Sequence, residues 1–131
     1  MHCPYCFKSV EFITSKEFYG VDYKTNLYVC RPCDARVGTH GNSDKALGTL
    51  ANKQLRALRM ACHYSFDKTW KTRRRRKNAA RTRAYRWLQA EMNLTEQEAH
   101  IGRFDVEQCK KLLSIMNKMT LEQFKERIDY F

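Results

Sequence analysis

The spacing of hydrophobic residues divides the chain into a short part typical of β-strands and a longer part typical of α-helices. Between residues 10 and 29, apolar residues form two short runs separated by polar turn residues. Val10, Phe12 and Ile13 belong to the first run, and the second occupies residues 21–29, with a turn near Gly20 or at residues 25–26. This pattern predicts two strands that return on each other.

Beyond His40 the apolar residues recur every three or four positions, which predicts helices. One apolar stripe consists of Leu55, Leu58, Cys62 and Phe66 and ends near residue 70, and a second helix is expected over residues 72–91. Capping-box patterns at residues 95–98, 105–108 and 120–123 mark further helix starts, the last two before amphipathic segments. We therefore expect a bundle of about four helices.

Two C-x2-C pairs lie at the outer ends of the two predicted strands: Cys3 with Cys6, and Cys30 with Cys33. Each pair places two sulfurs on one side of a tight turn, and two pairs complete the tetrahedral shell that Zn²⁺ prefers. A disulfide or a redox-active pair does not explain two matched pairs in a reducing compartment. The sequence therefore predicts one structural Zn²⁺ site with four thiolate ligands.

Together these elements predict an α+β fold with two parts. Residues 1–45 form a two-stranded zinc ribbon with four cysteine ligands, and residues 46–131 form a basic helical bundle packed on it. A ribbon of this size buries little apolar surface, so the metal supplies much of its folding free energy.

The positive charge is concentrated in one third of the chain. The net charge is +11, and residues 51–90 alone contain thirteen Lys and Arg against one acidic residue. Residues 71–86 read KTRRRRKNAARTRAYR. Such a field attracts polyanions, and nucleic acid is the leading candidate. A membrane partner is not expected, because the basic face lacks a broad apolar strip and no apolar run is long enough to span a bilayer.

We expect the basic residues of this segment to contact phosphates, because the planar fork of Arg pairs with two phosphate oxygens. The predicted contacts are Lys71, Arg73, Arg74, Arg75, Arg76, Lys77, Arg81, Arg83 and Arg86. Lys53, Arg56 and Arg59 of the preceding helix extend this patch if they are exposed. Tyr85 and Trp87 are candidates for stacking on bases, although packing in the core is the favoured role for both.

The remaining metal-binding or titratable side chains form a candidate secondary site. Its members are His40, His63, Asp67, His100 and Asp105. His63 and Asp67 are four residues apart and share a helix face, where they can form a simple hydrogen bond. The sequence contains no H-E-x-x-H motif, no Gly-rich phosphate loop and no hydrolase elbow, so no catalytic residue is predicted.

Several linked motifs resemble a known family. They include C-x-P-C-D-A-x-V-G-x-H at residues 30–40, L-G-T-L-A-N-x-x-L-R at 47–56 and H-I-G-x-F-D-x-x-x-C at 100–109. With CPYC near the start, they resemble the uncharacterised zinc-finger-containing domain family of bacteria and their phages. The resemblance implies zinc on the four cysteines of the two pairs and includes the candidate secondary site in the family pattern, but it implies no activity. The dense Arg73–Arg76 run and the tail at residues 119–131 depart from that pattern.

The leading hypothesis is a small zinc-ribbon protein, phage or prophage encoded, that binds the phosphate backbone of nucleic acid through its Arg-rich helix. The first alternative is a protein-interaction module that docks on an acidic surface of a host nucleic-acid enzyme. The second is a metal-dependent nuclease that uses the His and Asp group. We expect a cytoplasmic protein, in the host cytoplasm if a phage encodes it, because the first residues lack an apolar secretory stretch. The sequence leaves DNA or RNA, strandedness and oligomeric state open.

Overall fold

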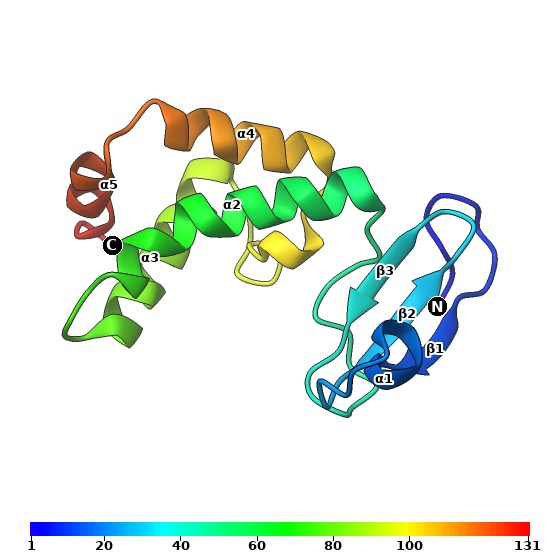
Figure 1. Cartoon of the computed structure of the whole chain (residues 1–131). Coiled ribbons are helices and arrows are strands. Elements are labelled where there is room, and N and C mark those ends of the chain that lie inside the picture. Colours follow the sequence, from blue (N-terminus) through cyan, green and yellow to red (C-terminus); the bar gives the residue numbers. More distant parts are fainter. The chain divides into compact units, whose positions relative to one another are not determined.

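The computed structural model describes all 131 residues and divides them into two compact units, Met1–Arg56 and Ala57–Phe131. The first unit contains an antiparallel sheet, and the second consists of helices (Figure 1). The predicted α+β class is therefore confirmed. None of the helices has the length and apolar composition that crossing a membrane requires.

The sheet of the N-terminal unit has three strands, one more than the sequence predicted. Strands β1 (Glu11–Thr14), β2 (Asn26–Cys30) and β3 (Ala35–Gly38) are antiparallel in the order β1-β2-β3. Cys30 at the end of β2 pairs with Ala35 at the start of β3. The tight turn around the second cysteine pair therefore sends the chain back along β2, which is why the extra strand forms.

The connection between β1 and β2 contains a short helix, α1 (Ser15–Tyr19), that the apolar pattern did not predict. The Thr14 hydroxyl accepts a hydrogen bond from the backbone N–H of Glu17 at 3.1 Å and caps the helix start. Gly20 ends the helix with a φ of 78°, a left-handed conformation that glycine adopts without steric cost. The strand predicted over residues 21–29 is correspondingly shorter and occupies only Asn26–Cys30.

The core of the N-terminal unit is small and gathers around the cysteines. Cys3, Cys30, Ala35 and Leu50 form its buried cluster, and Cys6 and Cys33 pack against it with three partly buried apolar residues. A core of four buried residues stabilises a unit only weakly unless a metal or disulfides contribute. All six cysteines are free thiols, so no disulfide supplies that stability.

The helical unit contains the four predicted helices and one turn of 3-10 helix. They are α2 (Lys53–Lys71), α3 (Lys77–Met92), η1 (Ile101–Arg103), α4 (Val106–Asn117) and α5 (Leu121–Ile128). Asp105 and Gln108 form a capping box at the start of α4, and Thr120 and Gln123 form another at the start of α5. α2 and α4 lie side by side, and the Cys62 thiol donates a hydrogen bond to the Cys109 carbonyl at 3.4 Å (Figure 1).

The prediction that a helix begins near residue 72 is wrong. α3 begins at Lys77, and residues 72–76 form the turn that joins it to α2. Arg76, just before the helix, has a φ of 57° and provides no side-chain cap. Four consecutive arginines in a first turn would repel one another and the positive end of the helix dipole. The turn keeps all four outside the helix.

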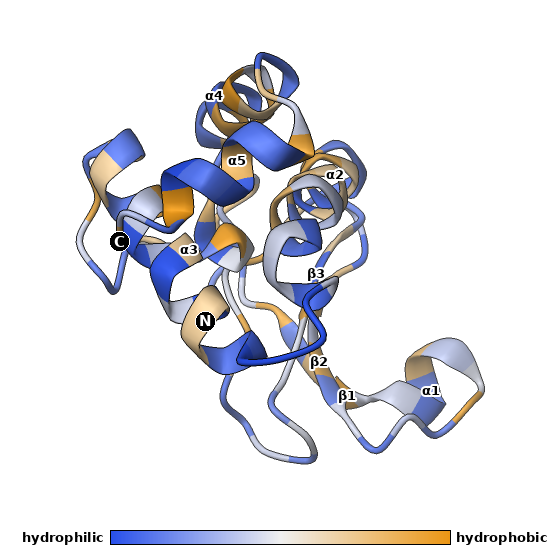
Figure 2. Cartoon of the chain, turned by 90° about the vertical axis from the view of Figure 1, so that its left-hand side faces the viewer, coloured by the Kyte–Doolittle hydropathy of each residue, from blue (hydrophilic) through white to orange (hydrophobic).

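The core of the helical unit is an aromatic cluster from three helices. Phe66 of α2, Trp87 of α3 and Phe124 of α5 are each at most 2% exposed. The Trp87 and Phe124 ring centroids are 4.7 Å apart, and the Phe66 and Phe124 centroids are 5.9 Å apart. The helices carry both hydrophobic and hydrophilic segments, as expected when one face is buried (Figure 2). α5 is therefore an integral part of this unit.

Replacing Phe124 by alanine should destabilise the helical unit by about 3–5 kcal/mol, because it removes a buried aromatic ring and leaves a cavity. Urea unfolding of the zinc-loaded protein, followed by far-ultraviolet circular dichroism, measures this change. Tyr130→Ala is the control, since Tyr130 is 91% exposed and its loss should change stability by less than about 0.5 kcal/mol. Equal stability of the two variants would show that α5 is not part of the core.

Candidate metal centre and basic surface

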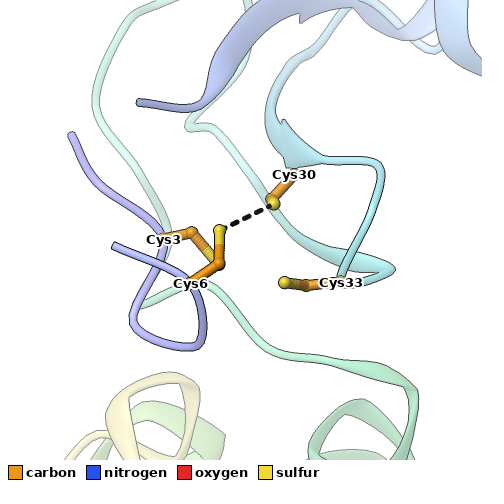
Figure 3. A group of neighbouring side chains, drawn as sticks. All are labelled: Cys3, Cys6, Cys30 and Cys33. Atoms are coloured by element: carbon orange, nitrogen blue, oxygen red, sulfur yellow. Dashed lines mark hydrogen bonds between the residues drawn. The ribbon is translucent and has the colours of Figure 1, made fainter. Parts of the chain in front are cut away.

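The four cysteine side chains of the two C-x2-C pairs turn towards a common point (Figure 3). Their sulfur atoms all lie within 4.8 Å of one another, and the sulfurs of Cys6 and Cys30 are 3.7 Å apart. Four sulfurs at about 2.3 Å from a central zinc ion form a tetrahedron with edges of about 3.8 Å. The donor set therefore fits zinc in number, chemistry and spacing.

The local backbone holds each cysteine pair in a tight turn. In the first pair, the backbone N–H of Phe7 donates to the Cys3 carbonyl and that of Cys3 donates to the Lys8 carbonyl, both at 2.8 Å. The N–H of Tyr5 points at the Cys3 sulfur at 3.4 Å. The residue after each pair, Phe7 or Asp34, has a positive φ, 63° or 49°, which reverses the chain immediately after the second cysteine.

The electrostatics of the four thiols also suit a cation. Burial raises the pKa of Cys3, but hydrogen bonds from the backbone of Cys6 and Tyr5 and from neighbouring thiols outweigh it and lower the value to about 7. At Cys33, burial and the neighbouring thiols raise the pKa to about 12. One thiolate forms readily, whereas four adjacent thiolates repel one another unless a divalent cation lies between them.

A bound zinc ion here would supply structural stabilisation, because four sulfur ligands leave no coordination position for water or substrate. The four ligands belong to the N-terminal segment and to the turn between β2 and β3, so a bound metal would hold these two segments together at one end of the sheet. The class defined by this site and fold is a four-cysteine zinc ribbon linked to a helical unit.

The chain belongs to the family of zinc-finger-containing domains, which it matches over residues 1–119. The family and the single zinc site on Cys3, Cys6, Cys30 and Cys33 thus agree with the sequence-based prediction. No curated protein and no solved structure matches the chain significantly. The family match ends just before α5, so that helix lies outside the matched segment.

The predicted phosphate contacts fall into two groups, of which the first is exposed and without partners. Arg74, Arg75 and Arg76 lie in the turn between α2 and α3, and Lys77 begins α3. All four are exposed, and their side chains make no ion pair or hydrogen bond. We call these four residues the basic turn.

The second group of predicted contacts interacts with other residues of the helical unit. Asp129 accepts a hydrogen bond from Arg73 Nη2 at 3.1 Å and lies 3.9 Å from Arg83 Nε. Arg86 Nη1 donates to the Phe131 carbonyl at 3.2 Å. The Lys71 ammonium is 3.8 Å from the Asp67 carboxylate. Arg81 has no acidic partner, and its guanidinium lies over the Trp70 and Tyr85 rings.

Two expected extensions of the patch do not form a free basic surface. Arg56 donates hydrogen bonds to the Asp34 and Ala51 carbonyls at 2.6 and 2.8 Å. Arg59 is only 8% exposed, and its Nε donates to the Phe104 carbonyl at 2.9 Å. Of the two proposed stacking residues, Trp87 is a core residue at 2% exposure. Tyr85 is half-buried, so a ligand can reach only this ring.

The structure brings together two of the five residues of the candidate secondary site, His63 and Asp67, and places the other three elsewhere. Nδ1 of His63 and Oδ2 of Asp67 are 3.3 Å apart, and Oδ1 of Asp67 accepts a hydrogen bond from the Trp70 indole at 3.2 Å. Asp105 caps α4, and His100 lies beside a cavity on α3. His40 belongs to the N-terminal unit. The structure contains one group of three or more metal-binding side chains that converge, and this group is the cysteine tetrad.

Sequence reasoning missed Asp129. This residue is 56 positions from Arg73 in the chain, and no local motif marks the pair. Only the packing of α5 against α2 and α3 brings the carboxylate to the arginines. The signal available in the sequence was the capping box at residues 120–123, which predicts the helix but not its position.

Purified protein should contain one zinc ion per chain. The double variant Cys6→Ser, Cys33→Ser should contain none and should lose the ordered N-terminal unit, because metal binding and folding are coupled there. Inductively coupled plasma mass spectrometry measures zinc content. The matched control is Cys62→Ala with Cys109→Ala, which removes the two buried cysteines of the helical unit and should retain one zinc. A zinc-free wild type would refute the metal assignment.

Proposed function

We propose that this protein binds nucleic acid through phosphate contacts made by the basic turn and continued by Arg81 and Arg86 along α3. The observation that supports this most strongly is the run of four adjacent cations, all exposed and none neutralised by the protein. On the strength of the family resemblance, the proposal also includes action in the cytoplasm of a bacterium or of a phage-infected host.

The basic turn has an energetic cost that a polyanion would offset. Adjacent like charges destabilise the folded chain, and Arg76 adds strain because a non-glycine residue in the left-handed region costs about 1–2 kcal/mol. Phosphates placed between the arginine side chains would relieve the repulsion and release condensed counterions. Contacts of this kind position a strand but do not read its bases.

The proposal assigns no reaction to the protein. Four sulfur ligands leave no open coordination position on a bound zinc ion. Asp67 is only 8% exposed, and its carboxylate contacts His63, Trp70 and Lys71. The zinc unit therefore contributes a stable scaffold, and the helical unit contributes the contact surface.

Binding to short DNA or RNA should weaken steeply with salt. The four contacts of the basic turn alone give a slope of log K against log salt of about −3 to −4, at 0.7–0.9 per phosphate, and contacts by Arg81 and Arg86 would steepen it further. Fluorescence anisotropy with labelled single strands and duplexes across a salt series measures it. The variant Arg74→Ala, Arg75→Ala, Arg76→Ala should reduce the slope by about 2–3 and leave the zinc content unchanged.

The matched control removes three positive charges elsewhere in the helical unit. Lys110, Lys111 and Lys118 are exposed residues of α4 and its C-terminal end, and their replacement by alanine should change the slope by less than one. Equal effects of the two triple variants would contradict a specific role for the basic turn. Weak binding to every nucleic acid, unchanged by either variant, would redirect the search to an acidic protein surface.

Asp129→Asn should strengthen binding to nucleic acid. It removes the carboxylate that neutralises Arg73 and lies near Arg83, which makes one or two more cations available and steepens the salt slope by about one. Glu122→Gln is the control, since it also removes one carboxylate from the C-terminal segment, and Glu122 lies 3.9 Å from Lys125 and pairs with no arginine. The same anisotropy series measures both variants, and unchanged binding by Asp129→Asn would exclude α5 as a restraint on this surface.

A further inference from the structure

A cavity of about 350 Å³ lies on the helical unit beside α3. One wall consists of successive turns of α3, with Arg81, Tyr85, Arg86 and Gln89, and the other consists of the segment after that helix, with Glu96 and His100. Small-ligand sites typically have volumes of about 300–1,000 Å³. This cavity therefore has room for one small polar molecule and excludes a duplex.

One wall of the cavity presents flat surfaces on which a planar ring can stack. The Arg81 guanidinium lies 4.7 Å from the Tyr85 ring centroid and 5.5 Å from that of Trp70. Unpaired bases stack on aromatic rings and on arginine planes, and such stacking is independent of base identity. The Arg81 guanidinium, supported by the Tyr85 ring beneath it, therefore forms a surface suited to a nucleobase.

These flat surfaces are held in place from behind. The Tyr85 ring contacts the core residue Phe66 edge-on, with centroids 5.1 Å apart. The Trp70 indole N–H donates to Asp67, which is 8% exposed. Burial, with a contribution from Asp67, raises the pKa of Tyr85, so the phenol is neutral at physiological pH. Because the Tyr85 ring is fixed and neutral, the Arg81 guanidinium that lies over it loses little conformational entropy when a ligand stacks there.

The polar groups of the cavity match the rest of a nucleotide. Arg81 and Arg86 provide two positive charges against the one carboxylate of Glu96, so the cavity favours an anion such as a phosphate. The Gln89 amide both donates and accepts hydrogen bonds, and Glu96 can accept from an exocyclic amino group of a base. Stacking, phosphate and edge contacts are thus available in one place.

The cavity is also continuous with the proposed phosphate-binding surface. Arg81 lies four residues, or about 6 Å along the helix axis, from Lys77 of the basic turn. A strand that follows the basic turn on to α3 would therefore reach the cavity with its next nucleotides.

We propose that this cavity binds a single unpaired nucleotide, with its base stacked on the Arg81 guanidinium over Tyr85 and its phosphate near Arg86. If the nucleotide belongs to a bound strand, the inference rests on the proposed function and makes it more specific. The favoured ligands are then single-stranded segments or duplexes with an unpaired nucleotide. A free nucleoside monophosphate has the same chemistry, and the experiment separates the two sources.

The first arm of the test uses free 5′-AMP and 5′-UMP, titrated into the zinc-loaded protein and followed by isothermal titration calorimetry. Saturable binding is expected. Gln89→Met keeps the side-chain length and uncharged character but removes the hydrogen bonds, and should weaken binding about three- to tenfold. Gln97→Met is the matched control: Gln97 is exposed, lies outside the cavity lining, and its replacement should have no effect.

The second arm compares a labelled single strand with its duplex by anisotropy. The wild type should favour the single strand about tenfold, and Gln89→Met and Tyr85→Leu should reduce this preference while retaining the salt slope. Tyr85→Phe keeps the ring and should retain the preference, and the retained salt slope of Tyr85→Leu separates lost stacking from a folding defect.

The outcomes distinguish this inference from the proposed function. Salt-steep strand binding without monophosphate binding, and with no effect of Gln89→Met or Tyr85→Leu, would overturn the cavity proposal and leave the phosphate surface intact. Monophosphate binding that Gln89→Met weakens, without binding to any strand, would support a site for free nucleotides and overturn the proposed function. Loss of both would overturn both.

Discussion

Repulsion among the cations of residues 71–77 constrains how α2 and α3 are joined, and much of the helical unit follows from that constraint. α2 ends at Lys71, and α3 begins only at Lys77. The arginines between them occupy a turn, where their side chains can diverge and stay hydrated. The chain supplies two forms of relief nearby: Asp129 pairs with Arg73, and the Trp70 and Tyr85 rings lie under Arg81. Neither reaches the basic turn itself, which stays exposed and unpaired.

The two units obtain their stability in different ways. The N-terminal unit has a small buried core that includes two of its own zinc ligands, so its fold depends on the metal. The helical unit has an aromatic core that spans α2, α3 and α5 and contains no metal ligand of the tetrad. α5 and the residue after it lie beyond the segment that matches the family, and they add Phe124 to that core and Asp129 to the arginine surface.

The sequence predicts the parts of this structure that depend on local chemistry. The cysteine spacing identified the zinc site, and two capping boxes identified the starts of α4 and α5. Thr14, Glu17 and Gly20 carried equally local signals for α1, but the apolar residues around them suggested a strand. β3 depends on pairing with β2, and the Arg73–Asp129 contact joins residues far apart in the chain. Neither leaves a local pattern. The start of α3 was misplaced because helical spacing of the apolar residues was weighed above charge repulsion.

We propose that the basic turn is the surface that contacts nucleic acid. The most direct test is a titration of the ¹⁵N-labelled, zinc-loaded protein with a short single strand, followed by ¹H–¹⁵N correlation spectra. The account predicts that the largest chemical-shift changes fall on residues 74–77 and continue along the exposed face of α3. Changes confined to the zinc unit or to α4, or no changes at all at low salt, would contradict it.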